Sequence, residues 1–440
     1  MRFQAPRGTR DFYPEELAVR RHIESVWRQA SIDFGFEEVD GPTFEHLDLY
    51  TVKSGEGIVN ELFSFKRAGG EDTYALRPEF TPTLARLIAA KGSALPPPIK
   101  WFAIPNFFRA ERPQRGRLRE FFQWNVDLVG LEGAALDAEV IATAVTALRR
   151  FGLTPQDVQV RLSHRLAAAG IVRRLGVPEE RVAAAFELLD RRDKLEPAEF
   201  AKRATELGLD DAARARFDAI ARTTIPLGGE LAAPLEALGI ALDDVPSLFS
   251  LRDELAAVGL AEWCRIDLGI VRGLAYYTGT VFEIHEATGA ERAVAGGGRY
   301  DGLVELFGGP RMPAMGFGMG DVVLGLLLKE RGLLPGDAAT LLPRPDVFVI
   351  SAGGDEAERA MRRLTAELRA AGLHARHTYK TTRNVGKLLS DANRNRSRTA
   401  LILGDELAEG RAMLKDLKSG DQQPIAISSM IEELRRLLGR

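Results

Sequence analysis

The stretch IKWFAIPNFFRAERPQRGRLREFFQWNVDLVG, residues 99–130, decides the architecture that the rest of the chain must complete. Its two ends are rich in aromatic and β-branched residues, which favour strands. Between them lies the polar loop RPQRGRL, residues 112–118. A loop that contains Pro and Gly between two such runs is typical of a hairpin. We therefore predict two long antiparallel strands, residues 99–111 and 119–130.

Length and composition limit the kind of protein. The 440 residues are 45% hydrophobic and 28% charged, an ordinary globular mixture long enough for about two or three domains. The only cysteine is Cys264, which excludes a disulfide framework and a cysteine-based zinc site and favours a reducing, cytoplasmic location. The polar start MRFQAPRGTRDFYPEE is unlike a signal peptide, and no apolar run is long enough to span a membrane.

Helical and strand patterns are mixed in the first three quarters of the chain. Apolar residues at helical spacing predict a helix over residues 16–34, which Gly35 ends, and residues 81–92 and 133–150 show similar patterns. With the hairpin, they predict an α+β domain over residues 1–330 whose sheet is mixed and mainly antiparallel. From about 165 to 250 the chain is rich in Ala, Leu, Arg and Glu, which predicts a helical insertion.

The last part of the chain is organised differently. Residues 331–344 contain proline and predict a linker. In residues 345–440 strand and helix patterns alternate, which predicts a small α/β domain with a largely parallel sheet. Residues 341–440 carry a net charge of +5, from 18 Lys and Arg and 13 Asp and Glu, so the first 340 residues carry −8. A basic C-terminal part permits a local contact with RNA.

Five arginines, at positions 109, 112, 115, 117 and 119, occur within eleven residues of the hairpin. One interpretation is a solvated hairpin tip. The other is phosphate binding, because Arg109 and Glu111 precede the turn on a strand with apolar neighbours, and an arginine near a buried strand face usually has an anionic partner. Guanidinium groups bind phosphate in two-point geometry, so the residues favour phosphate binding.

The segment ALRPEFTPTLAR, residues 75–86, places Glu79 and Thr81 at a strand-to-helix junction. In a structural interpretation, Thr81 caps the helix and Pro82 lies in its first turn. In a functional interpretation, Glu79 faces a pocket and accepts hydrogen bonds from an ammonium group. The residues leave both interpretations open.

Two glycine-containing stretches follow later in the chain. VRGLAYYTGTVFEI, residues 271–284, sets Arg272 and two tyrosines before an apolar strand. If the chain is extended there, Tyr276 and Tyr277 point to opposite faces, so one can line a pocket while the other packs in the core. The alternative is a core tyrosine pair beside a surface arginine. AGGGRYDGLVELFGG, residues 295–309, has three successive glycines, which let a ligand or another backbone approach closely.

Taken in order, these segments resemble one family. GTRDFYPEE, LRPEFT, FRAERPQRGRLREFFQ, VRGLAYYTG and AGGGRYDGL are similar to segments of histidyl-tRNA synthetases, which are class II aminoacyl-tRNA synthetases. GFEEVDGPTFE, residues 35–45, resembles the first class II motif, which builds a dimer interface, and residues 108–123 resemble the second. The resemblance covers nearly the whole chain. It implies a homodimer with the class II synthetase fold, a helical insertion and a C-terminal α/β anticodon-binding domain.

The resemblance also implies a reaction, the ATP-dependent ligation of L-histidine to tRNA(His) through a histidyl-adenylate. ATP is a substrate and Mg²⁺ a cofactor. Arg109 and Arg272 are the implied catalytic cations, on opposite sides of the α-phosphate, where they stabilise the negative charge of the transition state. Arg272 stands where a metal ion would otherwise help, so no metal ligands are predicted in the chain. Arg109, Glu111 and Arg117 are the implied ATP-binding residues.

The implied histidine pocket combines charged and aromatic side chains. Asp127 is expected to accept a hydrogen bond from an imidazole N–H, and Tyr277 to line the imidazole pocket. A buried carboxylate and hydroxyl would be left unpaired by any other amino acid, which provides specificity. Three further residues are expected to hold the α-ammonium group, namely Glu79, Thr81 and Gln123. The full implied set is Glu79, Thr81, Gln123, Asp127, Arg272, Tyr276, Tyr277 and Tyr300.

The implied tRNA contacts lie in two places. Gln114, Arg115 and Arg117 in the hairpin loop can reach the acceptor end, where family members recognise an extra 5′ guanosine. RHTYKTTRNVGKLLSDANRNRSR, residues 376–398, contains seven Lys and Arg and one Asp, so Arg383 and Lys387 are candidates for the anticodon face. No membrane partner is expected.

The chain also departs from the family pattern. Ala275 stands where an aspartate is usual, and Phe80 where glycine is common. In GFGMGDVVLGLLL, residues 316–328, Val322 and Val323 replace the Glu-Arg pair of the third class II motif, whose arginine binds the γ-phosphate of ATP. Another cation could replace it, such as Arg117 or Arg311.

A second hypothesis follows from these departures. Some synthetase-like paralogues do not charge tRNA but sense histidine and regulate its biosynthesis. Such regulators typically lack the anticodon domain and the catalytic arginine. This chain has Arg272 and a full C-terminal domain, which favours the enzyme.

Overall fold

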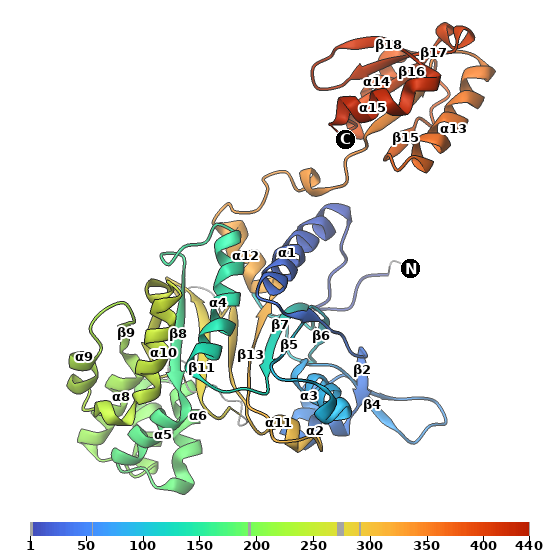
Figure 1. The fold of residues 1–440 in the computed structure, drawn as a ribbon. Helices are drawn as coiled ribbons and strands as arrows, with labels where there is room; N and C mark the ends of the chain where they lie inside the picture. The colour runs from blue at the N-terminus through green and yellow to red at the C-terminus, as the bar shows by residue number, and fades with distance from the viewer. Residues whose placement is uncertain (1–2, 55, 192–194, 271–276, 290–291, 440) are drawn as a thin grey trace. The chain divides into compact units, whose positions relative to one another are not determined.

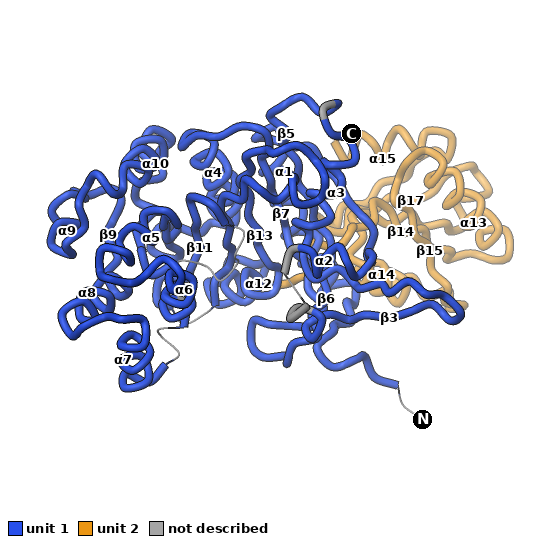
Figure 2. Tube along the Cα trace, turned by 90° about the horizontal axis from the view of Figure 1, so that it is seen from below, with its two compact units in different colours: residues 1–336 blue, residues 337–440 orange. Residues whose placement is uncertain are grey.

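The computed structural model describes residues 3–54, 56–191, 195–270, 277–289 and 292–439. The chain forms two compact units, residues 1–336 and 337–440 (Figures 1 and 2). The boundary between them falls within the segment 331–344 that the sequence suggests as a linker.

A ten-stranded sheet forms the centre of the first unit. Its strands are ordered β1-β5-β7-β13-β12-β11-β8-β10-β9, with β6 paired to β7, and only the pairs β1–β5 and β8–β10 are parallel. The predicted mixed, mainly antiparallel sheet is therefore confirmed. The strands are β1 (Glu37–Glu38), β5 (Ile99–Ala103), β6 (Asn106–Phe108), β7 (Glu120–Val129), β8 (Val158–His164), β9 (Thr224–Pro226), β10 (Cys264–Asp267), β11 (Thr280–Glu286), β12 (Ala295–Arg299) and β13 (Ala314–Gly320).

The predicted hairpin forms, but its first strand is not continuous. It is divided into β5 and β6 at Ile104 and Pro105, and both pieces pair antiparallel with β7. Proline has no N–H to donate to the ladder, although the Pro105 carbonyl still accepts from the Gln123 N–H at 3.1 Å. The prediction of one strand over residues 99–111 is therefore wrong at this point.

Helices cover one face of the sheet. Helix α1 (Pro14–Asp33) ends where the sequence predicts, since Gly35 adopts a φ of +75°. It packs on α4 (Ala134–Arg150), which lies against β7 and β13 (Figure 1). The Trp27 ring of α1 stacks on the Trp124 ring of β7 at 6.0 Å. The other helices outside the insertion are α2 (Asp48–Ser54), α3 (Thr81–Lys91), α11 (Leu303–Leu306) and α12 (Asp321–Glu330).

Alternation along β7 separates two environments. Trp124, Val126 and Leu128 pack in the core beneath α1 and α4. Phe121 and Val129 contact a different core, which also contains Tyr277 and Tyr300. Because successive side chains of a strand point to opposite faces, Gln123 and Asp127 lie on this second face.

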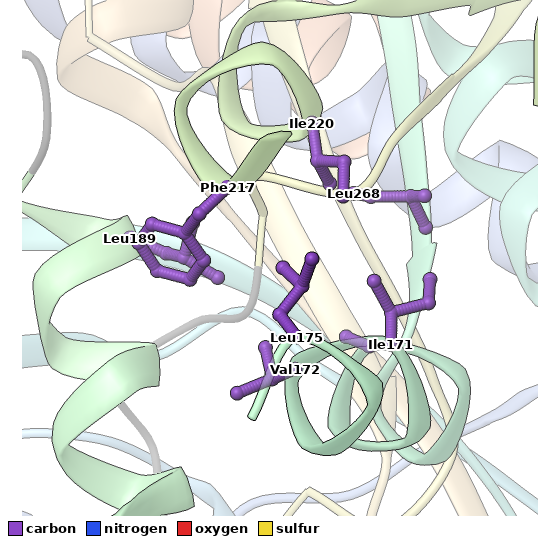
Figure 3. A pocket seen from close by; sticks show the side chains of 8 residues that line it. Ile171, Val172, Leu175, Leu189, Phe217, Ile220 and Leu268 are labelled. Atoms are coloured by element: carbon purple, nitrogen blue, oxygen red, sulfur yellow. The ribbon is translucent and has the colours of Figure 1, made fainter. Parts of the chain in front are cut away.

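The insertion is helical, as predicted, but it also lends a strand to the main sheet. The short strand β9 pairs with β10 at the edge of the sheet. The first helices surround their own core, in which Val172, Leu189 and Phe217 line an apolar gap of about 10 Å³ (Figure 3). The helices are α5 (Arg165–Arg174), α6 (Val182–Asp190), α7 (Pro197–Glu206), α8 (Asp211–Arg222), α9 (Ala232–Ala237) and α10 (Pro246–Ala257).

The N-terminal segment is tied to the hairpin and to α12. The Gly8 carbonyl accepts from the backbone N–H groups of Arg119 and Glu120, at 2.8 and 3.2 Å. Arg10 pairs with the buried Asp321 at 2.7 Å, and the other oxygen of Asp321 accepts from the Phe122 N–H at 2.9 Å. The segment therefore joins the second strand of the hairpin to the first turn of α12.

A smaller sheet and the second unit complete the fold. Strands β2 (Phe44–His46), β4 (Thr73–Leu76) and β3 (Ser64–Lys66) form a three-stranded antiparallel sheet. In the second unit, β15, β14 and β16 are parallel as predicted, whereas the antiparallel strands β17 and β18 were not foreseen. The elements are β14 (Val347–Ser351), α13 (Asp355–Ala370), β15 (Ala375–His377), α14 (Val385–Arg394), β16 (Thr399–Leu403), β17 (Arg411–Asp416), β18 (Gln422–Ala426) and α15 (Met430–Leu438).

A buried ion pair joins α4 to the sheet and provides a test of the fold. Arg299 of β12 pairs with Asp137 of α4, and both side chains are less than a tenth exposed. We expect Arg299→Ala to lower the free energy of unfolding by about 3–5 kcal/mol, because it leaves a buried carboxylate unpaired. All four tryptophans lie in the first unit, so urea unfolding followed by tryptophan fluorescence measures it.

The control for this test is Lys202→Ala, which removes an exposed pair with Glu206 on α7 of the same unit. That variant should unfold like the unmodified chain, since exposed pairs contribute about 0–1 kcal/mol. Equal unfolding free energies for Arg299→Ala and the unmodified chain would show that the buried pair does not stabilise the fold.

Candidate active site

Two glycines of β13 leave room for polar side chains of β7. Gly316 is paired with Asp127, and a Cβ at Gly316 would lie 2.1 Å from Asp127 Oδ1. A Cβ at Gly318 would lie 2.7 Å from the side-chain amide carbon of Gln123. Both distances are shorter than non-bonded contacts allow, so any other residue at these glycines would displace Asp127 or Gln123. The glycine-rich strand thus forms a floor on which the two side chains rest.

The neighbouring strand β12 does the same for an aromatic ring. A Cβ at Gly298 would lie 2.8 Å from the ring of Tyr277. Tyr277 is only 7% exposed and belongs to the same core as Tyr300. The sequence suggested that the glycines of AGGGRYDG let a ligand or another backbone approach closely. In the structure, Gly298 lets the side chain of Tyr277 approach.

Asp127 and Tyr300 form a buried pair at the end of this floor. The Tyr300 hydroxyl donates to Asp127 Oδ1, and the two residues are 3% and 6% exposed, respectively. Burial raises the pKa of Asp127 to about 7, although the hydrogen bond from Tyr300 lowers it. A carboxylate without a cationic partner is costly in such surroundings. The site therefore holds an acceptor that a bound N–H group would stabilise.

Arg109 lies at the start of the hairpin loop, where two contacts orient it. Its Nε donates to the Pro78 carbonyl at 3.1 Å, and its guanidinium carbon lies 5.1 Å from the centre of the Phe121 ring. The carbonyl contact and the ring fix the position of the guanidinium. Arg109 also lines the large cavity described below.

Glu79 and Thr81 lie at the junction between β4 and α3, and both are half-buried. Helix α3 begins at Thr81, its N-cap residue is Phe80, and no side-chain hydrogen bond caps it. The structural interpretation of Thr81 as the cap is therefore wrong, while Pro82 does lie in the first turn. Phe80, at a position where the resemblance suggested glycine, is fully buried in the core that also contains Tyr277 and Tyr300.

A buried arginine that sequence reasoning left unassigned positions this junction. Arg77, which is 3% exposed, donates to the Asn106 carbonyl at 2.9 Å and to the Gly41 carbonyl at 2.8 Å, and it pairs with Asp40. These bonds join the segment before Glu79 to the start of β6.

The hairpin tip is held by local pairs. Gln114 and Arg117 form an isolated β-bridge around Gly116, whose φ is +73°. Arg117 also pairs with Glu111 across the loop. Arg115 points to the other side, where it pairs with Glu330 at the end of α12. Gln114 and Arg117 therefore face the cavity, whereas Arg115 lies outside it.

A cavity of about 1190 Å³ extends from the hairpin across β13, β12 and β11. Of the residues expected to bind substrates, Arg109, Gln114, Arg117 and Gln123 line it. Val322 and Val323, at the positions where the family resemblance leads one to expect a Glu-Arg pair, line it too. Its far end carries a second charged group on β8, β10 and β11, in which Arg161 pairs with Asp267 at 3.4 Å and His285 with Glu283 at 2.8 Å.

Sequence reasoning missed three arginines of this cavity, Arg161, Arg222 and Arg292. Arg292 lines it near the hairpin tip. Burial lowers the pKa of Arg292, and the positive charges of Arg117 and Arg109 lower it further, whereas Glu111 raises it. The only signal in the sequence is a lone cation before the glycine strand, and it belongs to no motif that we could name.

Three predicted features cannot be placed. Arg272, Ala275 and Tyr276 fall in residues 271–276, outside the described residues.

In the second unit, Arg383 and Lys387 are exposed around the start of α14. Asn384 caps this helix by accepting from the Lys387 N–H at 3.0 Å. Tyr379 precedes them with 87% of its surface exposed, and its ring lies 4.7 Å from that of His377. An exposed aromatic ring beside cations suits a single-stranded RNA.

Comparisons with known proteins cover most of the chain. The family model described as histidyl-tRNA synthetase matches residues 8–320, and that described as anticodon binding domain matches residues 346–437. The histidine–tRNA ligase of Opitutus terrae is 43% identical over 426 residues, covering 94% of each chain. That of Thermococcus kodakarensis is 37% identical over 447 residues, covering 100% of this chain and 99% of its own length.

Solved structures share the fold. The histidyl-tRNA synthetase of Nostoc sp. PCC 7120 has a TM-score of 0.77 and 24% identity, over 99% of this chain and 100% of its own. A protein of Bacillus halodurans C described as an ATP phosphoribosyltransferase regulatory subunit/histidyl-tRNA synthetase has a TM-score of 0.72 and 24% identity, over 92% and 99%. At this identity both likenesses show the fold alone.

The raised pKa of Asp127 gives a test of its burial. The pKa rises from 3.8 to about 7, so ionisation of Asp127 opposes folding above pH 3.8, increasingly up to about pH 7 and constantly beyond. We expect Asp127→Asn to gain stability relative to the unmodified chain between pH 5 and pH 8, by about 1–3 kcal/mol. Urea unfolding followed by tryptophan fluorescence at both values measures the change.

The comparison uses the same variant at two pH values, so packing differences cancel. A stability difference that is independent of pH would mean that Asp127 ionises as it does in the unfolded chain.

Proposed function

The chain belongs to the histidyl-tRNA synthetase family, and from that premise we propose which of its residues carry out the reaction. Its activity is the ligation of L-histidine to tRNA(His), with ATP as the second substrate. The regulatory alternative is not favoured, because curated ligases match the chain over nearly its full length and the anticodon model matches residues 346–437.

In the first step, a carboxylate oxygen of histidine attacks the α-phosphorus of ATP. A new O–P bond forms, the bond from the α-phosphorus to the bridging oxygen breaks, and pyrophosphate leaves. Arg109 is assigned to the hairpin side of the α-phosphate, because it lines the cavity and the Pro78 carbonyl holds its Nε. Arg272 is assigned to the opposite side on the family resemblance. Fixed cations act most strongly where charge develops.

Asp127 selects the imidazole. Its buried carboxylate accepts from an imidazole N–H while Tyr300 donates to the same carboxylate. Tyr277 lies across the glycine floor and forms a wall of the pocket, and Tyr276 is assigned to the pocket on the resemblance. The buried Asp127–Tyr300 pair is the observation that supports the proposal most, because an amino acid without a ring N–H would deny this carboxylate the second donor that offsets its burial.

The α-ammonium group of histidine binds nearer the hairpin. Gln123 lies on the same face of β7 as Asp127, four residues away, or roughly 13 Å along the strand. Glu79 and Thr81 join it from the turn before α3. These three groups offer acceptors for ammonium, which donates three hydrogen bonds and accepts none.

ATP lies over the hairpin. Arg117 is assigned to its phosphate tail and Glu111 to its base. We expect Mg²⁺ to enter with its phosphates. Within the described residues no group of three or more His, Cys, Asp or Glu could hold a metal ion, so no step here is assigned to a metal held by side chains.

In the second step, the 3′-terminal ribose of the tRNA attacks the carbonyl carbon of the adenylate, the ester forms and AMP leaves. An adenylate phosphate oxygen can take the proton. Gln114, Arg115 and Arg117 are proposed to contact the acceptor end, and Arg383 and Lys387 the anticodon. The last two are exposed.

A homodimer and a cytoplasmic location are part of the proposal. Exposed Phe44 and Phe65 meet Tyr74 on the three-stranded sheet, at ring distances of 5.6 to 5.9 Å, and such an apolar patch suits a protein interface. The buried, lone Cys264 agrees with a reducing compartment. None of the described helices is both long and apolar enough to cross a membrane.

The activity is tested by histidine-dependent ATP–pyrophosphate exchange and by charging of tRNA(His). We expect Asp127→Ala to lower kcat/KM for histidine in the exchange reaction by about 10³-fold or more, because the imidazole loses its buried acceptor. Tyr300→Phe should lower it by about tenfold, since one hydrogen bond to the carboxylate is lost.

The KM for ATP serves as the control and should stay within about twofold in both variants. Normal exchange in Asp127→Ala would contradict the assigned role of Asp127. Exchange that does not need histidine, or none at all in the unmodified chain, would contradict the proposed function.

The anticodon assignment is tested by Arg383→Ala/Lys387→Ala. We expect this double variant to raise the KM for tRNA(His) and to flatten its dependence on salt by about one to two units in log–log slope, because each cation that contacts phosphate releases about one counterion. Pyrophosphate exchange should not change, as it needs no tRNA.

The matched control is Arg411→Ala/Lys418→Ala, which removes two exposed cations from β17 and the turn that follows. If both double variants raise the KM for tRNA equally, the effect is one of net charge and the assignment is wrong.

A further inference from the structure

The third class II motif of this chain has lost its cation. Val323, at the position of the motif-three arginine, is 7% exposed and packs in the core of the first unit, and it also lines the cavity. The phosphate tail of ATP would therefore meet an apolar side chain at this wall. A triphosphate in such a place needs a cation from elsewhere.

Arg292 reaches the same place from another element. A Cβ built on Gly116 at the hairpin tip would lie 3.3 Å from Val323 Cγ2 and 3.6 Å from Arg292 Cδ. Arg292 and Val323 thus meet at one point, although Arg292 precedes β12 and Val323 lies in the first turn of α12. All three residues line the cavity.

The charges around this point suit a polyanion. Arg109, Arg117 and Arg292 line one end of the cavity. The positive charges of Arg117 and Arg109 lower the pKa of Arg292. The negative charge of Glu111, which pairs with Arg117, partly offsets this repulsion. Three arginines around one carboxylate leave an excess of positive charge, which a group with several negative oxygens would neutralise.

The other candidate cation lies at the wrong end of the sheet. Arg311 precedes β13, whereas Val323 follows it. The seven residues of β13 separate the two ends by roughly 20 Å. Among the described residues that line the cavity, Arg117 and Arg292 occur but Arg311 does not.

We propose that Arg292 binds the terminal phosphates of ATP in place of the missing motif-three arginine. The inference rests on the proposed function. When the bond between the α-phosphorus and the bridging oxygen breaks, its electron pair goes to the leaving pyrophosphate. Arg292 donates hydrogen bonds to the β- and γ-phosphate oxygens and stabilises this charge, while Arg109 acts at the α-phosphate.

The test is ATP–pyrophosphate exchange without tRNA, using the full chain. Arg292→Ala should raise the KM for ATP by about ten- to a hundredfold and leave the KM for histidine within about twofold, because only the phosphate contacts are lost. Arg292→Lys should raise it less, since lysine keeps the charge but not the two-point geometry. Arg311→Ala is the matched control and should behave like the unmodified chain.

A stricter test places an arginine at position 323, where the third class II motif usually has one. In Arg292→Ala/Val323→Arg, the new guanidinium starts from a side chain that meets the same point. The KM for ATP should therefore recover by about tenfold or more relative to Arg292→Ala. Recovery would not occur if Arg292 only held the loop before β12 in place.

Other outcomes would overturn the inference. An unchanged KM for ATP in Arg292→Ala would do so, and so would a rise only in the KM for tRNA during charging, which would assign Arg292 to a phosphate of the tRNA. If the unmodified chain lacked exchange, the proposed function would fail by itself. Calorimetric binding of a non-hydrolysable ATP analogue to the unmodified chain and to Arg292→Ala would still decide the role of Arg292.

Discussion

The site depends on a close approach between a glycine strand and polar side chains. β13 has no side chain where Asp127 and Gln123 cross it, and the space that a single Cβ would need is already filled. The same strand must also keep its ladder with β7 and β12, because these pairings hold the sheet together. The register of β13 therefore also sets the shape of the pocket. A shift of β13 by one residue would place side chains at the positions where only glycine fits.

Side chains of β7 point alternately to two faces, so the same strand contributes to the apolar core and to the polar site. One face supplies Trp124 and its neighbours to the main core, and the other carries Gln123 and Asp127. Among the described residues no cation pairs with Asp127, and burial, which raises its pKa to about 7, makes its ionisation oppose folding. The tryptophan side of the same strand contributes the apolar burial that offsets this cost. A buried polar residue that lowers the stability of the protein is typical of functional sites.

Local patterns predicted the elements of this fold better than their details. The hairpin, α1 and the parallel part of the second unit follow from periodicity and turn residues. The break at Pro105 was visible in the sequence, but its effect depends on which edge of the strand faces β7. The sequence left open whether Thr81 caps α3, because threonine suits either side of a helix start, and the structure places it as the first helical residue. Arg292 could not be found, since its neighbours Gly116 and Val323 come from distant segments that only the fold brings together.

The N-terminal segment has a consequence for the use of the chain in the laboratory. Gly8 and Arg10 bind the second hairpin strand and the start of α12, the two elements that contribute Gln123 and Val323 to the cavity. A protease that trims the first ten residues would therefore loosen the part of the cavity that Gln123 and Val323 line, and would not simply remove a passive tail. Affinity tags and fluorescent labels are better attached at the other end of the chain, after α15.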